Sequence, residues 1–200
     1  GSKIDISFQP YIALAAWKLD RPARICYSRG ESMRASTKRH PSDIHLRVGC
    51  DDKGLISGFV FDGVFNTGAY ASWGPTVANR VPIHACGPYK TDHYRASSVA
   101  VHTNAPPAGA FRGFGVPQSA IAQECAYDLL ADEIGMDRLA FRRSNALKNG
   151  TPTVTGQVFK NGVGIDDCFA ALEQPWKNAL TKAADFNVEA IANGSPWRSG

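Results

Sequence analysis

The stretch at residues 103–118, which reads TNAPPAGAFRGFGVPQ, constrains the fold of this chain more than any other. Pro106 and Pro107 exclude helix and ladder pairing, and the three glycines permit positive φ and close approach by a ligand or another backbone. Arg112 is a permanent cation between the rings of Phe111 and Phe114, and Pro117 suits the first turn of a helix. A glycine-rich loop that leads into a helix N-terminus is a common anion site. The residues alone leave two interpretations open: a binding loop, or a structural loop whose rings are buried and whose arginine caps a carbonyl.

Composition excludes several classes of protein. Two hundred residues, of which 44% are hydrophobic, are enough for one good core or two smaller ones. The net charge of +4 comes without any run of five like charges, so no nucleic-acid-binding tail is expected. No apolar stretch approaches the roughly 18 residues of a membrane span. The five cysteines lie far apart without CxxC spacing, which argues against a metal cluster or a disulfide framework and favours a reduced, cytoplasmic setting.

The pattern of apolar residues predicts strands and helices in separate blocks. Two strands, at 43–49 and 55–69, are joined by turn residues and form an antiparallel hairpin. Residues 29–41 read as a charged connection. Helices are expected at 6–19, from about Pro75, at 117–134, at 137–146 and at 165–184, the first of them buried and the last interrupted by Pro175. The apolar stripe expected on the 117–134 helix consists of Ala120, Ile121, Ala122, Cys125, Ala126, Leu129 and Leu130. This arrangement indicates an α+β fold, antiparallel strands with packed helices, rather than an alternating doubly wound sheet.

The segment TNAPPAGAFRGFGVPQSAIAQE at 103–124 resembles the signature of the xanthine oxidase family of molybdenum hydroxylases. In that family AFRGFG or AFRGYG is followed by a small residue, Pro and Gln, and passes beside a molybdenum ion held by a pterin dithiolene. The resemblance extends from residue 1 to about residue 180. It implies that 1–146 is part of the first molybdopterin-binding domain, and that 147–200 is the connection to a second such domain and its start.

The resemblance also implies which residues surround the cofactor. Arg112 takes the place of the arginine close to molybdenum, without being a ligand, where it would stabilise anionic charge. The remaining cofactor-binding positions are Gly1, Ala110, Phe111 and Gly113.

Three further residues are candidates for substrate binding. Phe114 occupies the position of the family's ring-stacking residue. Arg80 lies upstream of AFRGFG at the spacing of an arginine that contacts substrate oxygen in purine-oxidising members, although a surface arginine on a helix is the alternative. His84, four residues after Arg80, shares its helix face and is expected to support it.

The N-terminal residues depart from the family pattern. Gly1-Ser2-Lys3 resembles the end of a glycine-rich turn, with Ser2 in place of a glycine. Xanthine oxidases place a glutamate directly after the lysine of that turn, whereas this chain has Ile4 followed by Asp5. A substrate other than plain xanthine is therefore expected.

The activity implied by the resemblance is base-assisted hydroxylation of an N-heteroaromatic compound, purine-like or nicotinate-like, or of an aldehyde, with oxygen derived from water. The general-base glutamate belongs to a later domain of the family's subunit, so no catalytic base is expected here. Partners are the remainder of the molybdopterin subunit, an iron–sulfur subunit and, as a further candidate, an FAD subunit; nucleic acid and membranes are not expected. The alternative is a non-catalytic cofactor-binding or assembly domain with the same fold. A basic nucleotide-binding domain has no motif in its favour.

The missing base leads to the first prediction. The purified 200-residue chain should show no hydroxylase turnover with purine, nicotinate or aldehyde substrates, because it lacks the group that removes the proton. A dye-linked assay with added molybdenum cofactor checks this, and measurable turnover would overturn it.

Overall fold

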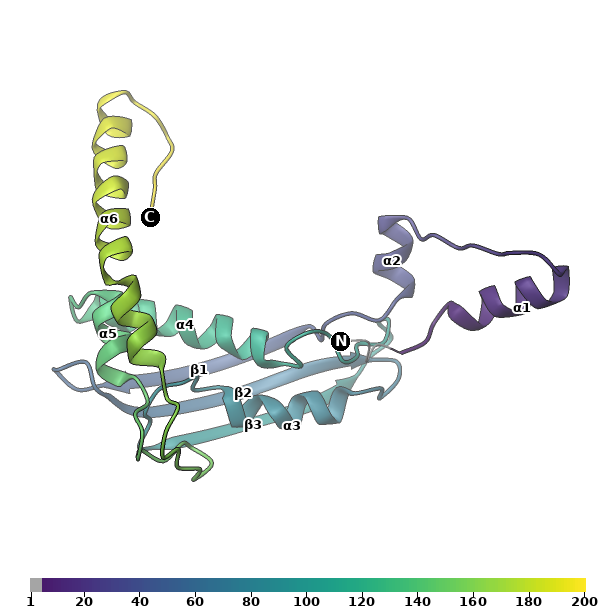
Figure 1. Ribbon diagram of the computed structural model, residues 1–200, viewed down its shortest axis with the longest axis horizontal. Helices are drawn as coiled ribbons and strands as arrows, with labels where there is room; N and C mark the ends of the chain where they lie inside the picture. The colour runs from purple at the N-terminus through teal and green to yellow at the C-terminus, as the bar shows by residue number, and fades with distance from the viewer. Residues whose placement is uncertain (1–4) are drawn as a thin grey trace. The chain divides into compact units, whose positions relative to one another are not determined.

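A computed structural model describes residues 5–200 (Figure 1). Gly1 and Ile4, on which two sequence predictions fall, lie outside the described residues. The elements are, in chain order, α1 (Gln9–Leu19), α2 (Arg29–Ala35), β1 (Ser42–Cys50), β2 (Ile56–Gly68), α3 (Gly74–His84), β3 (Tyr94–His102), α4 (Val116–Glu133), α5 (Arg138–Asn145) and α6 (Ile165–Ala192). In this part of the chain no helix combines the length and apolar character that crossing a bilayer requires.

The chain divides into two compact units. The first holds residues up to 49, 58–87 and 93–126, and the second holds 50–57, 88–92 and 127–200. The sheet and α3 belong almost entirely to the first unit, and α5 and α6 to the second.

The sheet has the order β1-β2-β3. β1 and β2 are neighbours joined by the short turn 51–55, in which Asp51 Oδ1 accepts hydrogen bonds from the backbone N–H groups of Lys53 and Leu55. This is the predicted hairpin. β2 and β3 instead pair in parallel, from Phe59 opposite Tyr94 onward. The α+β class is confirmed, and the sheet is mixed rather than purely antiparallel because the chain returns through α3 before it enters β3 (Figure 1).

The core of the first unit lies on one side of this sheet. Phe59, Phe61 and Phe65 alternate along β2 and are fully buried. Helix α3, expected from Pro75 and found to begin at Gly74, packs on β3. Tyr94 on β3 donates its hydroxyl to the backbone carbonyl of Pro82, which joins the strand to the end of the helix.

Two ion pairs in the second unit join α5 to α6. Asp137 caps α5, as the sequence predicts, by accepting from the backbone N–H of Ala140 at 2.8 Å. On the same helix Arg143 pairs with Asp166 at 3.0 Å and with Glu173 at 3.1 Å, both on α6.

Helix α4 buries a different stripe from the one predicted. The expected apolar positions include Ile121 and Leu129, which are 69% and 72% exposed. The buried positions are Gln118 and the i, i+4 series Ser119, Gln123, Tyr127 and Ala131. The prediction was wrong because hydropathy alone ranks Ile and Leu above the small and amide side chains that this helix buries.

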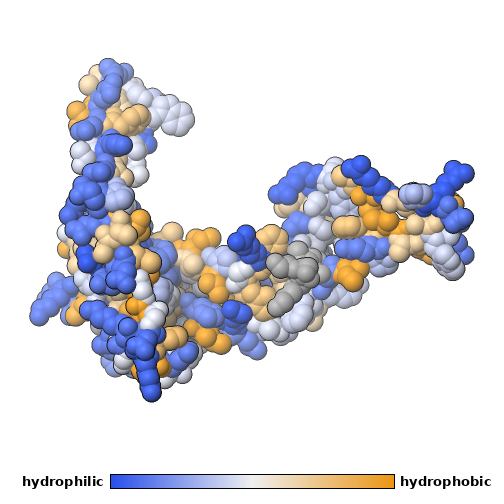
Figure 2. Space-filling model, viewed as in Figure 1, coloured by the Kyte–Doolittle hydropathy of each residue, from blue (hydrophilic) through white to orange (hydrophobic). Residues whose placement is uncertain are grey.

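Three other predictions about helices need correction. α1 has no buried residue, and Trp17 is 74% exposed, so the helix expected to be buried displays its apolar side chains (Figure 2). The predicted connection 29–41 contains α2, which begins with a capping box between Ser28 and Glu31; the S-x-x-E spacing was the signal for it. α6 continues through Pro175 to Ala192 instead of ending near 184.

Asn145 provides the second prediction. Its buried amide accepts from the N–H of Ile56 at 2.8 Å and donates to the carbonyls of Gly54 and Phe141. Asn145→Ala leaves these backbone groups unpaired, so the free energy of unfolding should fall by about 3 kcal/mol. Asn178→Ala, at an exposed amide on α6, should change it by less than about 0.5 kcal/mol. Denaturant unfolding of both variants measures these changes. Equal losses of stability in the two variants would contradict the structural role given to Asn145.

Candidate functional site

The AFRGFG loop, residues 110–115, has an unusual backbone. Gly113, Phe114 and Gly115 are three successive residues with positive φ, at 89°, 52° and 95°. Phe114 has a Cβ, so its left-handed conformation costs roughly 1 kcal/mol. Its N–H donates to the carbonyl of Phe111 at 2.8 Å, which closes the turn. Helix α4 follows directly, as expected from Pro117.

The loop packs directly on α3. A Cβ placed on Gly115 would lie 2.7 Å from Cγ2 of Val81 and 3.0 Å from Cγ1 of Val77. Real side chains do not approach this closely, so only glycine permits this approach to the helix.

This approach brings Phe114 to Arg80. The guanidinium carbon of Arg80 lies 5.9 Å from the centre of the Phe114 ring, within cation–π range. Trp73, just before α3, meets the same ring edge-on at 6.0 Å. Two residues that the sequence assigns to substrate binding are therefore adjacent.

His84 lies one turn after Arg80 at the end of α3. Partial burial and, second, the positive charge of Arg80 lower the pKa of His84 below its ordinary value. The imidazole is therefore mostly neutral near pH 7 and can donate or accept a hydrogen bond.

A second segment, which precedes β1 in the chain, runs beside the loop. The backbone of Lys38 accepts from the N–H of Gly109 at 3.0 Å and donates to the carbonyl of Pro107 at 3.4 Å. On α4, Gln118 donates its amide to the carbonyl of His40 at 3.1 Å. These bonds tie residues 38–40 to both ends of the AFRGFG loop.

Arg39, in that segment, contacts the loop through its side chain. Its guanidinium carbon lies 4.7 Å from the centre of the Phe111 ring. Nη2 donates to the backbone carbonyl of Arg112, and Nη1 donates to Oε1 of Gln118 at 3.4 Å.

The predicted cofactor-binding positions differ in burial. Ala110 is buried, Phe111 is 37% exposed, and Arg112 and Gly113 are exposed. The Arg112 guanidinium makes no hydrogen bond or ion pair with any group among residues 5–200. The backbone carbonyl of Arg112, in contrast, accepts a hydrogen bond from Arg39. The five side-chain donors of Arg112 are thus available to a group that approaches the loop.

Two buried polar side chains of the same unit have unpartnered atoms. His40 is 3% exposed, and its Nε2 has no hydrogen-bond partner among the described residues; the same holds for Nε2 of the buried Gln123. Burial and, second, the charge of Arg39 lower the pKa of His40. Buried amides and imidazoles without partners are rare in folded proteins, and because these two atoms are already covered by the chain itself, an internal water is the group that suits them.

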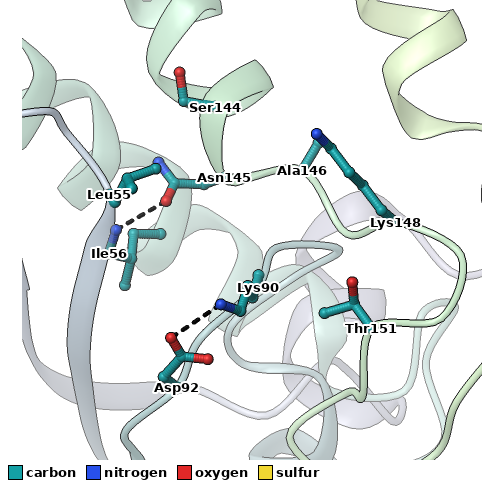
Figure 3. A pocket seen from close by; sticks show the side chains of 9 residues that line it. All are labelled: Leu55, Ile56, Lys90, Asp92, Ser144, Asn145, Ala146, Lys148 and Thr151. Carbon is teal, nitrogen blue, oxygen red and sulfur yellow. Dashed lines mark hydrogen bonds and ion pairs between the residues drawn. The ribbon is translucent and has the colours of Figure 1, made fainter.

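The hollows of the two units differ in their lining. In the first unit a hollow of about 410 Å³ is lined by residues 5–9, Ser36 and Thr37. A further one in the first unit, of about 280 Å³, lies along residues 41–43, Val64 and Asn66. In the second a hollow of about 200 Å³ lies between Asn145 and the Lys90–Asp92 ion pair (Figure 3). None of the predicted site residues lines the hollow of the second unit, and the 3.1 Å ion pair neutralises one of its lysines.

Across residues 5–200, no group of three or more His, Cys, Asp or Glu side chains is arranged to hold a metal ion.

Comparison with known proteins identifies the family. The model of the "Molybdopterin cofactor-binding domain" family matches residues 1–146. The chain is 40% identical over 165 residues to the nicotinate dehydrogenase large molybdopterin subunit of Eubacterium barkeri, covering 82% of this chain and 39% of that protein. It is 41% identical over 195 residues to a probable xanthine dehydrogenase subunit of Bacillus subtilis, covering 98% of this chain and 26% of that protein.

A solved structure agrees with these matches. The aldehyde oxidoreductase of Desulfovibrio gigas superposes with a TM-score of 0.81 at 28% identity, covering 90% of this chain and 20% of that one. The chain therefore belongs to the molybdopterin cofactor-binding domain family of xanthine oxidase-type molybdenum hydroxylases, as its resemblance implies. It spans about a quarter to two fifths of the length of the two curated relatives named here.

Sequence reasoning missed three residues of this site: Arg39, Trp73 and Gln118. Arg39 lies in a stretch that reads as a charged connection, and it meets Arg112 across 73 positions of sequence. Gln118 entered only as part of the family signature. No local pattern pairs these residues with the loop, so only the fold reveals them.

The pKa of His40 gives the third prediction. Because the folded state lowers this pKa, the unfolded chain binds the proton first as pH falls below about 6.5. The contribution of His40 to stability should thus be fully present above that pH and should be lost as pH drops toward the folded pKa. His40→Gln should reduce the loss of stability at low pH, leaving the part that His84 contributes, and His45→Gln, at an exposed imidazole on β1, should keep all of it. Thermal unfolding of the full subunit between about pH 7.5 and pH 5.5 checks this; identical pH profiles for the two variants would contradict it.

Proposed function

We propose that this chain is the part of a molybdenum-cofactor-binding subunit that forms one wall of the active site of an oxidoreductase. The enzyme would hydroxylate an N-heteroaromatic compound, purine-like or nicotinate-like, or an aldehyde. The proposal rests on the geometry of the AFRGFG loop. The side-chain donors of Arg112 have no partner among residues 5–200, and the Phe114 ring lies against Arg80.

The residues present fit a molybdopterin cofactor. The loop brings cationic and neutral donors, and residues 105–120 contain no carboxylate, which suits an anionic pterin group; the Asp5 carboxylate lies beside Gly109, three residues before Arg112. When bound, the cofactor supplies the oxidation of the substrate carbon and accepts its electrons.

The chain's own residues would bind and orient the substrate. The Phe114 ring offers a flat apolar surface for a heteroaromatic ring, and its tilt is fixed by Trp73. Arg80, on the same ring, would donate to a carbonyl or carboxylate oxygen of the substrate, with His84 keeping its neutral imidazole nearby. Arg112 would stabilise the negative charge that develops during the reaction.

The remainder of the site would come from polypeptide outside these 200 residues. The general-base glutamate and the iron–sulfur clusters, together with FAD where the enzyme uses it, would belong to other domains or subunits. Residues 1–146 would form part of the first molybdopterin-binding domain, with 147–200 leading into the second. Five free cysteines support a reduced, cytoplasmic setting.

The fourth prediction tests the role of Arg112 in the assembled enzyme. Arg112→Ala should lower kcat/KM by roughly 10²- to 10³-fold, because one fixed donor to the developing charge is lost. Arg47→Ala, at an exposed arginine on β1, should leave it unchanged. Steady-state kinetics with molybdenum analysis checks both.

Two results would count against this function. Arg112→Ala with intact activity would favour the non-catalytic alternative, in which the domain serves assembly. An assembled complex without molybdenum or pterin would do the same.

A further inference from the structure

We propose that Arg39 is a positioning residue that holds the AFRGFG loop in its left-handed turn and so keeps the Arg112 side chain free for the cofactor. This inference rests on the proposed function of the loop. Arg39 does not belong to the loop; it lies in the segment that precedes β1 in the first unit.

Arg39 binds the loop at three points. Its Nη2 donates to the carbonyl of Arg112, its Nη1 donates to Gln118 at the start of α4, and its guanidinium carbon lies over the Phe111 ring, 4.7 Å from the centre. The contacts with Arg112 and Gln118 lie on either side of the strained turn at residues 113–115. A rigid planar guanidinium can satisfy all three at once, which a lysine ammonium cannot.

The environment of Arg39 strengthens these bonds. Partial burial lowers its pKa somewhat, yet a guanidinium remains protonated at any physiological pH. A hydrogen bond from a charged donor is stronger than one between neutral groups, and it gains further where water is partly excluded. The bond to the Arg112 carbonyl therefore acts directly against opening of the turn that Phe114 closes.

The loop thus has two arginine–phenylalanine pairs, one on each side of Arg112. Arg39 lies over Phe111, and Arg80 lies over Phe114. In each pair, one arginine from outside the loop contacts one phenylalanine ring of the loop. Arg112, between them, is the cation that is left without a side-chain partner among residues 5–200.

The same contacts explain why Phe111 and Phe114 differ. Phe111 is engaged by a guanidinium that is itself bonded to the backbone, so its role is to anchor the loop. Phe114, which is half-buried, instead meets the side chains of Arg80 and Trp73, so its partners come from α3 and the residue before it rather than from the segment that holds the loop backbone.

Arg39→Met in the assembled holoenzyme tests the inference, with Arg39→Lys as the conservative variant and Arg47→Met as the control. Hydrogen–deuterium exchange of a peptide covering 105–118 reports loop opening independently of activity. Exchange at the amides of Phe114 and Val116, which close the turn, should become about 10-fold faster in Arg39→Met and change less in Arg39→Lys. The control should exchange like the natural enzyme.

Kinetics and metal analysis separate positioning from direct binding. The positioning role predicts that kcat falls by roughly 10-fold in Arg39→Met while molybdenum and pterin content stay unchanged. Unchanged exchange at residues 113–116 in both variants would overturn the inference, and so would loss of the cofactor with unchanged exchange, which would make Arg39 a cofactor ligand. If Arg112→Ala keeps full activity, the proposed function fails, but the exchange result still decides whether Arg39 holds the loop.

Discussion

The close contact between Gly115 and the two valines of α3 is the constraint on which the candidate site depends. Because no side chain fits there, the loop can lie directly on the helix. The backbone must then pass through three positive φ angles, which turns Phe114 back over Arg80. One steric condition in the backbone thereby determines which side chains meet, and hydrogen bonds from residues 38–40 keep the turn closed.

The parts predicted from sequence are those with a local signal. The AFRGFG segment predicts a loop that leads into a helix, and the i, i+4 spacing of Arg80 and His84 predicts a helix with both side chains on one face. The structure has both helices. The hairpin followed from turn residues at 51–54. In each case the residues that determine the element lie within a few positions of one another, so a pattern in the sequence is sufficient.

The parts that sequence missed depend on distant contacts or on absent neighbours. Arg39 meets the loop only because the segment before β1 runs beside residues 107–109. The buried face of α4 is lined by Ser119 and Gln123, and Ser119 satisfies its hydroxyl on the backbone of its own helix. Helix α1 looked like a buried helix because it is apolar, yet no described segment covers it. Hydropathy predicts that such a surface will be covered without indicating by what.

The central claim is that residues 110–115 line the pocket of a molybdenum–pterin cofactor. Anomalous diffraction at the molybdenum absorption edge, measured on crystals of the assembled enzyme, locates the metal without any assumption about the ligand. The account predicts a single molybdenum peak on the exposed side of the loop, beside Arg112 and Phe114. A peak beside the Asn145 hollow of the second unit, or anywhere that leaves Arg112 in bulk solvent, would contradict it.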